Sequence, residues 1–167
     1  MGGSLIRAAV IADTHVRAGT DRPLSERVYA ELASADVILH AGDILVAGML
    51  DELASMAPVH AVLGNNDHGL EATLPETLVI DLAGVPVGMV HDSGPTKGRA
   101  ARMRRRFPHS AVVVFGHSHQ PVDELGVDGQ RLFNPGSPTQ RRRAPTKTMG
   151  WLELRAGEVI GHEIVNV

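Results

Sequence analysis

The chain has 167 residues, a usual length for one domain with a substantial buried core. Its formal net charge of −3 gives no general attraction to nucleic acid or to an anionic membrane, and the absence of cysteine excludes disulfides and thiolate metal sites. No apolar run reaches the roughly 18 residues of a membrane span, and the first residues lack the pattern of a secretory signal. We therefore expect a single cytoplasmic domain over residues 1–167, with no membrane association.

The first half of the chain alternates apolar runs with helical patterns. Strands that alternate with helices usually pair in parallel through crossover connections, so this half predicts an α/β arrangement. The expected strands cover residues 5–12, 37–41 and 59–63, and the expected helices cover residues 24–35 and 46–56.

The second half is dominated by hairpin patterns, in which short turns separate apolar runs. One basic helix is expected over residues 99–107, and residues 137–148, rich in Pro, Arg and Thr, are expected to form one long loop. The expected strands cover residues 77–82, 85–90, 111–115, 121–126, 131–133, 149–154 and 159–165. Both halves together predict an α/β fold of two mixed β-sheets packed as a sandwich, with helices on the outer faces.

Five short polar clusters each follow an apolar run, at the points where the predicted strands end. They are Asp13-Thr14-His15, Gly42-Asp43, Gly64-Asn65-Asn66-Asp67, His91-Asp92 and Gly116-His117-Ser118-His119. In sheets of this kind, ligands gather beyond the carboxyl ends of the strands. The clusters offer seven side chains that can bind a metal: Asp13, His15, Asp43, Asn65, His91, His117 and His119. One ion rarely takes so many, whereas two ions that share one carboxylate would use them all, which indicates phosphoryl-transfer hydrolysis.

Taken singly, most of these residues also have a structural explanation. Asp43 could cap the helix that follows it, and Asn65 and Asn66 could be ordinary turn residues. His91 alone is explained as well by an ordinary loop residue as by a metal ligand. Two imidazoles spaced two residues apart after a strand, as in His117 and His119, have few structural uses. Five independent turns would not each need to present a ligand, so the complete set favours a metal site.

The order of the clusters resembles the calcineurin-like metallophosphoesterase superfamily. Its pattern is Asp-x-His, then Gly-Asp, then Gly-Asn-x-Asp/Glu, then His, then Gly-His-x-His. The spacing and size are similar to the small bacterial and archaeal phosphodiesterase branch, often called the YfcE-like family. Asn134-Pro135-Gly136-Ser137 followed by Arg141 is similar to the late pattern of that branch. The resemblance covers roughly residues 5–165.

This resemblance implies two metal sites and a hydrolytic reaction. The ligands would divide as Asp13, His15 and His119 for one ion and Asn65, His91 and His117 for the other, with Asp43 shared by both. A hydroxide bridging the ions would attack phosphorus, and the ions would neutralise charge on the phosphoryl oxygens. Imidazole nitrogens mixed with carboxylate and amide oxygens suit Mn²⁺, Fe, Zn²⁺ or Ni²⁺, of which we favour Mn²⁺.

Residues 66–68 are the predicted catalytic segment: Asn66, Asp67 and His68. Many relatives carry His where Asn66 stands, and that His protonates the leaving oxygen, whereas Asn66 can only hydrogen-bond a phosphoryl oxygen. We therefore assign the general acid to His68 or to water, although His68 also fits an exposed loop histidine. Asp92 stands where relatives commonly have Gly, either as support for a ligand imidazole or as a solvated turn residue.

Two groups of arginines bear on the substrate. Those in the 99–107 helix lack interleaved aromatic residues, which favours a solvated face over a nucleic-acid surface. The resemblance brings Arg141, Arg142 and Arg143 near the metals, where one of them would hold a substrate phosphate. The alternative is a flexible basic loop. We predict that Asn66 and Arg141 bind the substrate.

The sequence thus predicts a dinuclear-metal phosphodiesterase that acts on a small phosphate ester. One alternative is a phosphomonoesterase of the same fold, which would gain more from the general acid that position 66 lacks. Another is a non-catalytic protein-binding scaffold like the retromer subunit Vps29, although here all seven ligand positions hold competent residues. The natural substrate and self-association stay open.

Overall fold

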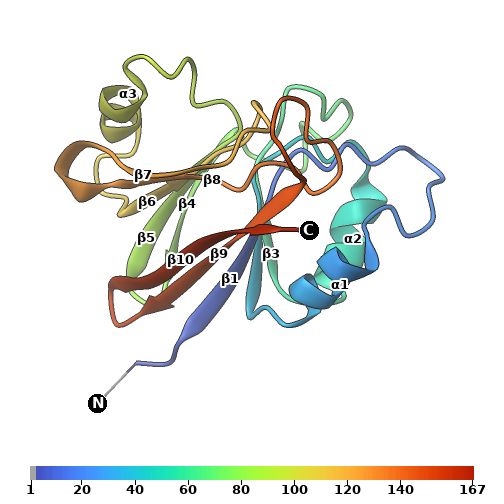
Figure 1. The fold of residues 1–167 in the computed structure, drawn as a ribbon, viewed down its shortest axis with the longest axis horizontal. Coiled ribbons are helices and arrows are strands. Elements are labelled where there is room, and N and C mark those ends of the chain that lie inside the picture. Colours follow the sequence, from blue (N-terminus) through green and yellow to red (C-terminus); the bar gives the residue numbers. More distant parts are fainter. Residues whose placement is uncertain (1–2) are drawn as a thin grey trace.

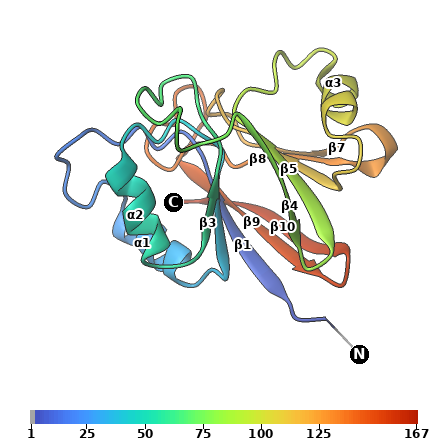
Figure 2. The same ribbon diagram turned by 180° about the vertical axis from the view of Figure 1, so that it is seen from behind.

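The computed structural model describes residues 3–167 and arranges them in four layers, with helices outside two β-sheets that pack face to face (Figure 1; Figure 2). The α/β sandwich expected from the sequence is therefore confirmed. In the described part of the chain, no helix has both the length and the apolar character needed to cross a membrane.

The first sheet has the strand order β10-β9-β1-β2-β3. Its strands are β1 (Ile6–Ile11), β2 (Val37–His40), β3 (Val59–Ala61), β9 (Thr148–Arg155) and β10 (Glu158–Asn166). β1, β2 and β3 run parallel, while β9 and β10 form an antiparallel hairpin beside β1. The crossover helices are α1 (Glu26–Ala33) and α2 (Ala47–Ala54), which cover the outer face of this sheet.

The second sheet has the strand order β4-β5-β6-β8-β7. Its strands are β4 (Thr77–Leu82), β5 (Val85–Val90), β6 (Val112–Val114), β7 (Val122–Leu125) and β8 (Arg131–Asn134), with a short 3₁₀ turn, η1 (Val127–Gly129), between β7 and β8. β5, β6 and β8 run parallel, and β4 and β7 are antiparallel to their neighbours. Helix α3 (Arg99–Arg106) packs on the outer face through Met103, with Phe107 beside it.

The central strands are continuous apolar runs because both of their faces are buried. In β1, Ala8 and Val10 face the other sheet, while Ala9 and Ile11 face α1 and α2. Such aliphatic side chains supply nearly all of the core, since the chain has only 3% aromatic residues. Each large one contributes roughly 1.5–3 kcal/mol on burial, so the sandwich gives the loops at its end a rigid base.

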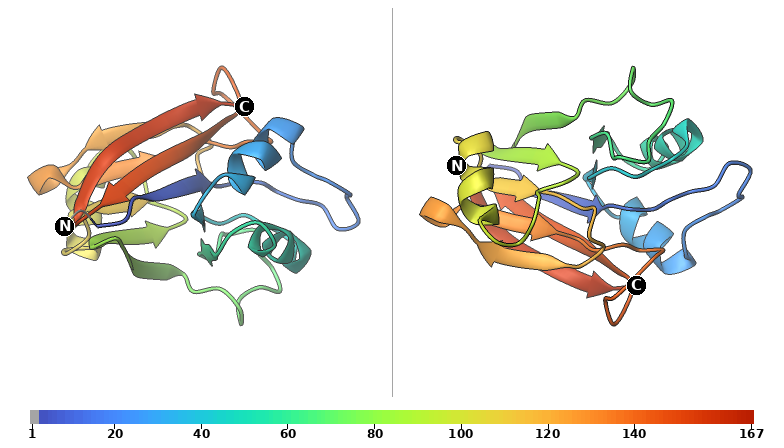
Figure 3. Two further views of the ribbon diagram at one scale, coloured as in Figure 1. Left: turned by 90° about the horizontal axis from the view of Figure 1, so that it is seen from below. Right: turned by 90° about the horizontal axis from the view of Figure 1, so that it is seen from above.

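The observed elements lie within one or two residues of the predicted bounds. Helix α1 begins later than residue 24 because Ser25 caps it, its Oγ accepting the backbone N–H of Val28 at 3.3 Å. Residues 137–147 contain no helix or strand, as expected. The loop after β1 extends beyond the sheets at the end where several other loops gather (Figure 3). The first two residues of the predicted domain lie outside the described range.

Candidate metal centre

The seven predicted ligands lie in loops that follow parallel strands of both sheets. Asp13 and His15 follow β1, Asp43 follows β2, and Asn65 follows β3. In the second sheet, His91 follows β5, while His117 and His119 follow β6. Because these strands are parallel within each sheet, their carboxyl ends meet at one edge of the sandwich. The structure brings all seven side chains together there, as the following distances establish.

Most of these ligands sit on strained backbone. Asp13, His15, Asp43, His117 and His119 all have positive φ angles, between 45° and 70°. Such left-handed conformations cost on the order of 1–3 kcal/mol per non-glycine residue and persist only where the surrounding structure enforces them. The loops therefore present their side chains in fixed directions.

A first group of ligand atoms is buried and lacks hydrogen-bond partners. Asp13 Oδ1 lies 3.8 Å from His15 Nε2 and 3.5 Å from His119 Nε2. Within residues 3–167, none of these three buried atoms has a hydrogen-bond partner. A buried polar atom without a partner costs about 1–3 kcal/mol, so three that face one another fit a cation placed between them.

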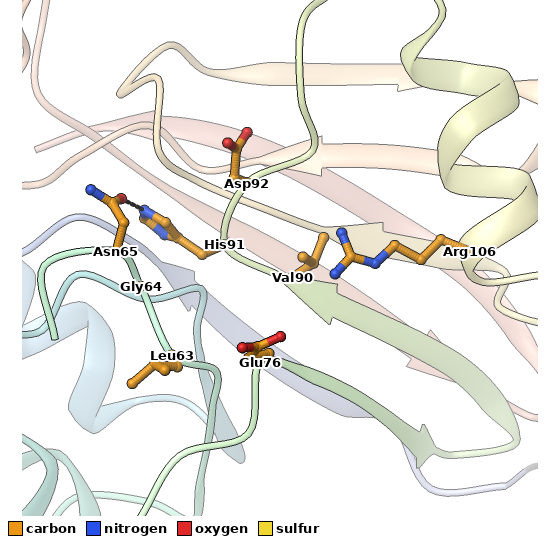
Figure 4. A pocket seen from close by; sticks show the side chains of 8 residues that line it. All are labelled: Leu63, Gly64, Asn65, Glu76, Val90, His91, Asp92 and Arg106. Carbon is orange, nitrogen blue, oxygen red and sulfur yellow. Dashed lines mark hydrogen bonds between the residues drawn. The ribbon is translucent and has the colours of Figure 1, made fainter. Parts of the chain in front are cut away.

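A second group lies directly beside the first. Asn65 Oδ1 lies 3.0 Å from His91 Nε2 and 3.1 Å from His117 Nδ1, and Figure 4 shows the contact between Asn65 and His91. Asp43 joins the two groups, because its Oδ2 lies 3.4 Å from both His15 Nε2 and His91 Nε2. This carboxylate therefore stands where an ion in either group could reach it.

Backbone carbonyls orient two of the imidazoles. His119 Nδ1 donates to the carbonyl of Gln140 at 2.6 Å, and His91 Nδ1 donates to the carbonyl of Ala41 at 2.7 Å. A carbonyl oxygen can only accept, so the proton lies on Nδ1 and Nε2 of each ring is turned toward the ligand groups. This is the usual support for a metal-binding histidine.

The charges in the centre favour metal binding. Burial acts to raise the pKa of Asp43, but hydrogen bonds from His91 and Asn66 outweigh it, so that the pKa lies well below its usual value. Burial lowers the pKa of His119 despite the Gln140 carbonyl and Asp13. Burial also acts to lower the pKa of His91, yet Asp43 and Asp13 raise it overall. The ionised Asp43 carboxylate thus lies beside His91, and a cation would take the proton from His91 and would find His119 neutral.

The three residues of the predicted catalytic segment lie in different surroundings. Asn66 contacts the shared carboxylate, its Nδ2 donating to Asp43 Oδ2 at 2.8 Å and its backbone N–H donating to Oδ1 at 2.9 Å. Asp67 is buried, and its carboxylate accepts only backbone N–H groups, from Asp43, Ile44, Leu45 and Gly64 at 2.7–2.9 Å. His68 is exposed, and within residues 3–167 no hydrogen bond joins it to a ligand. Asp67 is therefore a positioning residue for the loops after β2 and β3.

Two glycines of the clusters allow the ligand loops to approach closely. A Cβ atom at Gly64 would overlap the backbone nitrogen and the Oδ1 of Asp43. At Gly116, it would lie 2.8 Å from Asp13 Oδ2. The sequence carries a signal for this role, because a glycine directly precedes Asp43, Asn65 and His117.

The loop over residues 137–147 is bound to the metal centre. Ser137 Oγ donates to the carbonyl of Asp13 at 2.8 Å, and Thr139 Oγ1 donates to that of Thr14 at 2.9 Å. These bonds hold the loop after β1 and were not foreseen from the sequence.

Two arginines of the same loop have different hydrogen-bond partners, and the substrate contact expected of Arg141 stays a prediction. Arg142 Nη1 donates to the carbonyl of His117 at 3.4 Å, whereas Arg141 Nη1 donates within the loop, to the carbonyl of Ala144 at 3.1 Å. Asp92 is an exposed turn residue whose Oδ1 accepts the N–H of Gly94 at 2.7 Å, while its Oδ2 lies 4.0 Å from His117 Nε2, which is beyond hydrogen-bond distance.

Comparisons with known proteins agree with this geometry. The model of the calcineurin-like phosphoesterase superfamily domain matches residues 6–157. A protein of Methanothermobacter thermautotrophicus named a probable metallophosphoesterase is 33% identical, over 93% of this chain and 90% of its own length. Among solved structures, vacuolar protein sorting 29 (Vps29) of Cryptosporidium parvum superposes with a TM-score of 0.79 at 17% identity, covering 100% of both chains. An archaeal phosphodiesterase superposes with a TM-score of 0.70 at 17% identity, covering 97% of this chain and 100% of its own.

The two structural neighbours establish likeness of fold only, given their low identity. The family model covers all seven candidate ligands and the glycines before them, and the Methanothermobacter relative covers 93% of the chain. Together with the ligand geometry, they show that the chain belongs to the calcineurin-like phosphoesterase superfamily.

Proposed function

We propose that this metallophosphoesterase is a phosphodiesterase that uses two divalent transition-metal ions. The observation that carries the proposal is the convergence of three buried, unpartnered ligand atoms, Asp13 Oδ1, His15 Nε2 and His119 Nε2, beside a second group that shares Asp43. A single ion would leave part of this set unused. The mixture of imidazole, carboxylate and amide ligands fits Mn²⁺, which we favour over Fe, Zn²⁺ and Ni²⁺.

In this proposal the seven ligands hold the ions, with Asp13, His15 and His119 on one, Asn65, His91 and His117 on the other, and Asp43 on both. When bound, two such ions stabilise charge on the phosphoryl oxygens and lower the pKa of a water molecule. In the net reaction, the water oxygen joins phosphorus, the bond from phosphorus to the leaving oxygen breaks, and the alcohol departs with a proton.

The chain's other residues would position the substrate. The Asn66 amide lies beside Asp43, where it could turn to donate to a phosphoryl oxygen, and Arg142 presents a guanidinium at the edge of the His117 loop. A guanidinium is suited to bidentate contact with phosphate. His68 is kept as the proposed general acid, with water as the alternative.

A diester substrate is favoured over a monoester by the amide at position 66. Asn66 cannot release a proton at neutral pH, and esters with poor leaving groups gain most from a general acid. The shared fold with an archaeal phosphodiesterase adds support. The similarity to Vps29 favours a second candidate, a non-catalytic protein-binding scaffold, with which the complete ligand set agrees less well.

Metal loading and turnover of one protein preparation separate these functions. The chain is stripped with a chelator, reloaded with Mn²⁺, and assayed for metal content and for hydrolysis of bis(p-nitrophenyl) phosphate and p-nitrophenyl phosphate. We expect two ions per chain and a preference for the diester. Asp43→Asn should lower turnover by roughly 100-fold or more, because both ions lose a ligand. The matched control is Asp51→Asn, an exposed carboxylate on α2, which should change neither quantity. Metal-loaded protein that turns over neither ester would support the scaffold.

A further inference from the structure

A cavity of about 410 Å³ opens beside the second group of ligands (Figure 4). Its wall is built from four places in the sequence: the loop after β3, the residue before β4, the end of β5 with the two residues that follow it, and the last residue of α3. The lining residues are Leu63, Gly64, Asn65, Glu76, Val90, His91, Asp92 and Arg106. Because Asn65 and His91 belong to both the cavity and the metal centre, a phosphate held at the centre would have one of its ester groups at the cavity mouth. The volume falls in the range of small-molecule sites.

The walls of this cavity combine apolar and charged groups. Leu63 and Val90 supply apolar surface, on which a ring or carbon chain could rest. Arg106 reaches from the end of α3 with its guanidinium turned toward Val90, on the opposite side from the Asn65–His91 contact (Figure 4). Glu76 lies on a third side. A group lying across the cavity would therefore start at the metals and end near a cation.

Within residues 3–167, Arg105 and Arg106 are the arginines of α3 with no side-chain hydrogen bond or ion pair, and of these two Arg106 lines the cavity. Arg99 and Arg102 donate to the Oγ and the carbonyl of Ser93, and Arg104 lies 3.4 Å from Asp128. Within residues 3–167, no carboxylate lies within 4.0 Å of the Arg106 guanidinium, although Glu76 lines the same cavity. The guanidinium is thus available to a phosphate or carboxylate of a ligand.

We propose that this cavity is the subsite for one ester group of the substrate, and that this group carries a second phosphate or carboxylate that binds Arg106. Glu76 accepts hydrogen bonds from hydroxyls of the same group. The inference rests on the proposed phosphodiesterase function and narrows its substrate class to diesters with an additional anionic group. Arg106 then determines specificity and takes no part in the chemical step.

Two chromogenic diesters that differ by one phosphate test the proposal. They are the p-nitrophenyl ester of thymidine 5′-phosphate and the same compound with an added 3′-phosphate. We expect Mn²⁺-loaded protein to show a kcat/KM about tenfold higher for the 3′-phosphorylated compound, as one charge-assisted contact typically provides. Arg106→Gln should remove that preference through KM and leave the other substrate unchanged. Arg105→Gln is the matched control, because Arg105 is its exposed neighbour on α3 and does not line the cavity.

A binding measurement separates failure of the subsite from failure of the proposed function. Calorimetric titration of Mn²⁺-loaded protein with thymidine 3′,5′-bisphosphate should show affinity about tenfold weaker in Arg106→Gln than in the wild type or Arg105→Gln. Absence of turnover with Arg106-dependent binding would reject the phosphodiesterase and keep the anion subsite. Turnover of both diesters that does not change in Arg106→Gln would overturn the subsite. Equal losses of kcat/KM or of affinity in Arg106→Gln and Arg105→Gln would overturn it as well. Absence of both turnover and binding would overturn both.

Discussion

The carboxylate of Asp67 accepts the backbone N–H of Asp43 at 2.9 Å, so a residue that binds no metal holds the residue that both ions would share. The same carboxylate accepts the N–H groups of Ile44, Leu45 and Gly64. It therefore ties the loop after β2 to the loop after β3. This buried contact thus helps to hold the loop that carries Asp43 in place.

Asp67→Asn should destabilise the protein and weaken metal binding together. An amide keeps one acceptor oxygen but turns an NH₂ group toward two backbone donors, at a cost of about 2–4 kcal/mol in the free energy of unfolding. Urea unfolding of chelated protein measures the first effect, and Mn²⁺ titration measures the second. Asp51→Asn serves as the control. An unfolding free energy equal to that of the wild type would contradict the positioning role.

Gly64→Ala should disturb the centre through sterics alone, because the new Cβ would overlap Asp43. We expect a loss of about 2 kcal/mol or more in unfolding free energy and weaker Mn²⁺ binding. Gly48→Ala is a sharp control: Gly48 lies inside α2 with open space around its Cβ position, so alanine should stabilise the helix by up to about 1 kcal/mol. Equal unfolding free energies and equal Mn²⁺ affinities of Gly64→Ala and Gly48→Ala would show that the close contact between Gly64 and Asp43 is unimportant.

Arg142→Gln should weaken substrate binding more than Arg141→Gln. Arg142 contacts the His117 loop, whereas Arg141 is bonded to Ala144 within its own loop. Loss of one guanidinium contact to phosphate should raise KM for a diester about tenfold in the first variant, with little change in kcat. Steady-state kinetics of the two variants, which give KM and kcat for each, measure this difference. A larger effect of Arg141→Gln would contradict this expectation and would support Arg141 as the substrate contact.

His40 should make the metal-free protein less stable in acid. It is fully buried behind the centre, where Nδ1 accepts the N–H of Gly42 at 3.2 Å and Nε2 donates to Thr14 Oγ1 at 3.0 Å. Burial lowers its pKa from 6.5 to about 4. Between these values the unfolded chain binds a proton that the folded chain does not. The stabilisation that comes from keeping His40 neutral is therefore complete above pH 6.5. It is lost as the pH falls toward 4, which lowers the free energy of unfolding by about 3 kcal/mol in all.

The variant His40→Gln isolates this effect, because its side chain does not titrate. Its unfolding free energy, measured in urea with a chelator present, should decline less between pH 7 and pH 4.5 than that of the wild type. Parallel declines would mean that His40 is not held neutral.

The sequence predicted the fold and the convergence of the seven candidate ligands, because both follow from local patterns in the chain. Each strand is an apolar run, and each ligand cluster begins where a run stops, so the parallel pairing of β1, β2 and β3 was enough to bring Asp13, Asp43 and Asn65 to one edge. The position of the two carboxylates and four imidazoles after the strands was enough to identify them as candidate ligands.

Other features depend on three-dimensional contacts that no local pattern records. Asp67 belongs to a ligand-bearing cluster, yet its partners lie in a loop more than twenty residues earlier. Arg141 and Arg142 are adjacent and alike in sequence, and their different partners, the carbonyls of Ala144 and His117, depend on how the loop folds. The cavity that ends at Arg106 joins four separate parts of the sequence, so its shape could not be foreseen.

Crystals of the chain grown with Mn²⁺, with diffraction recorded near the manganese absorption edge, test the central claim most directly. We predict two anomalous peaks about 3.5–4 Å apart, both within bonding distance of Asp43. One should lie among Asp13, His15 and His119, and the other among Asn65, His91 and His117. A single peak at full Mn²⁺ saturation, or peaks that do not both touch Asp43, would contradict the dinuclear centre.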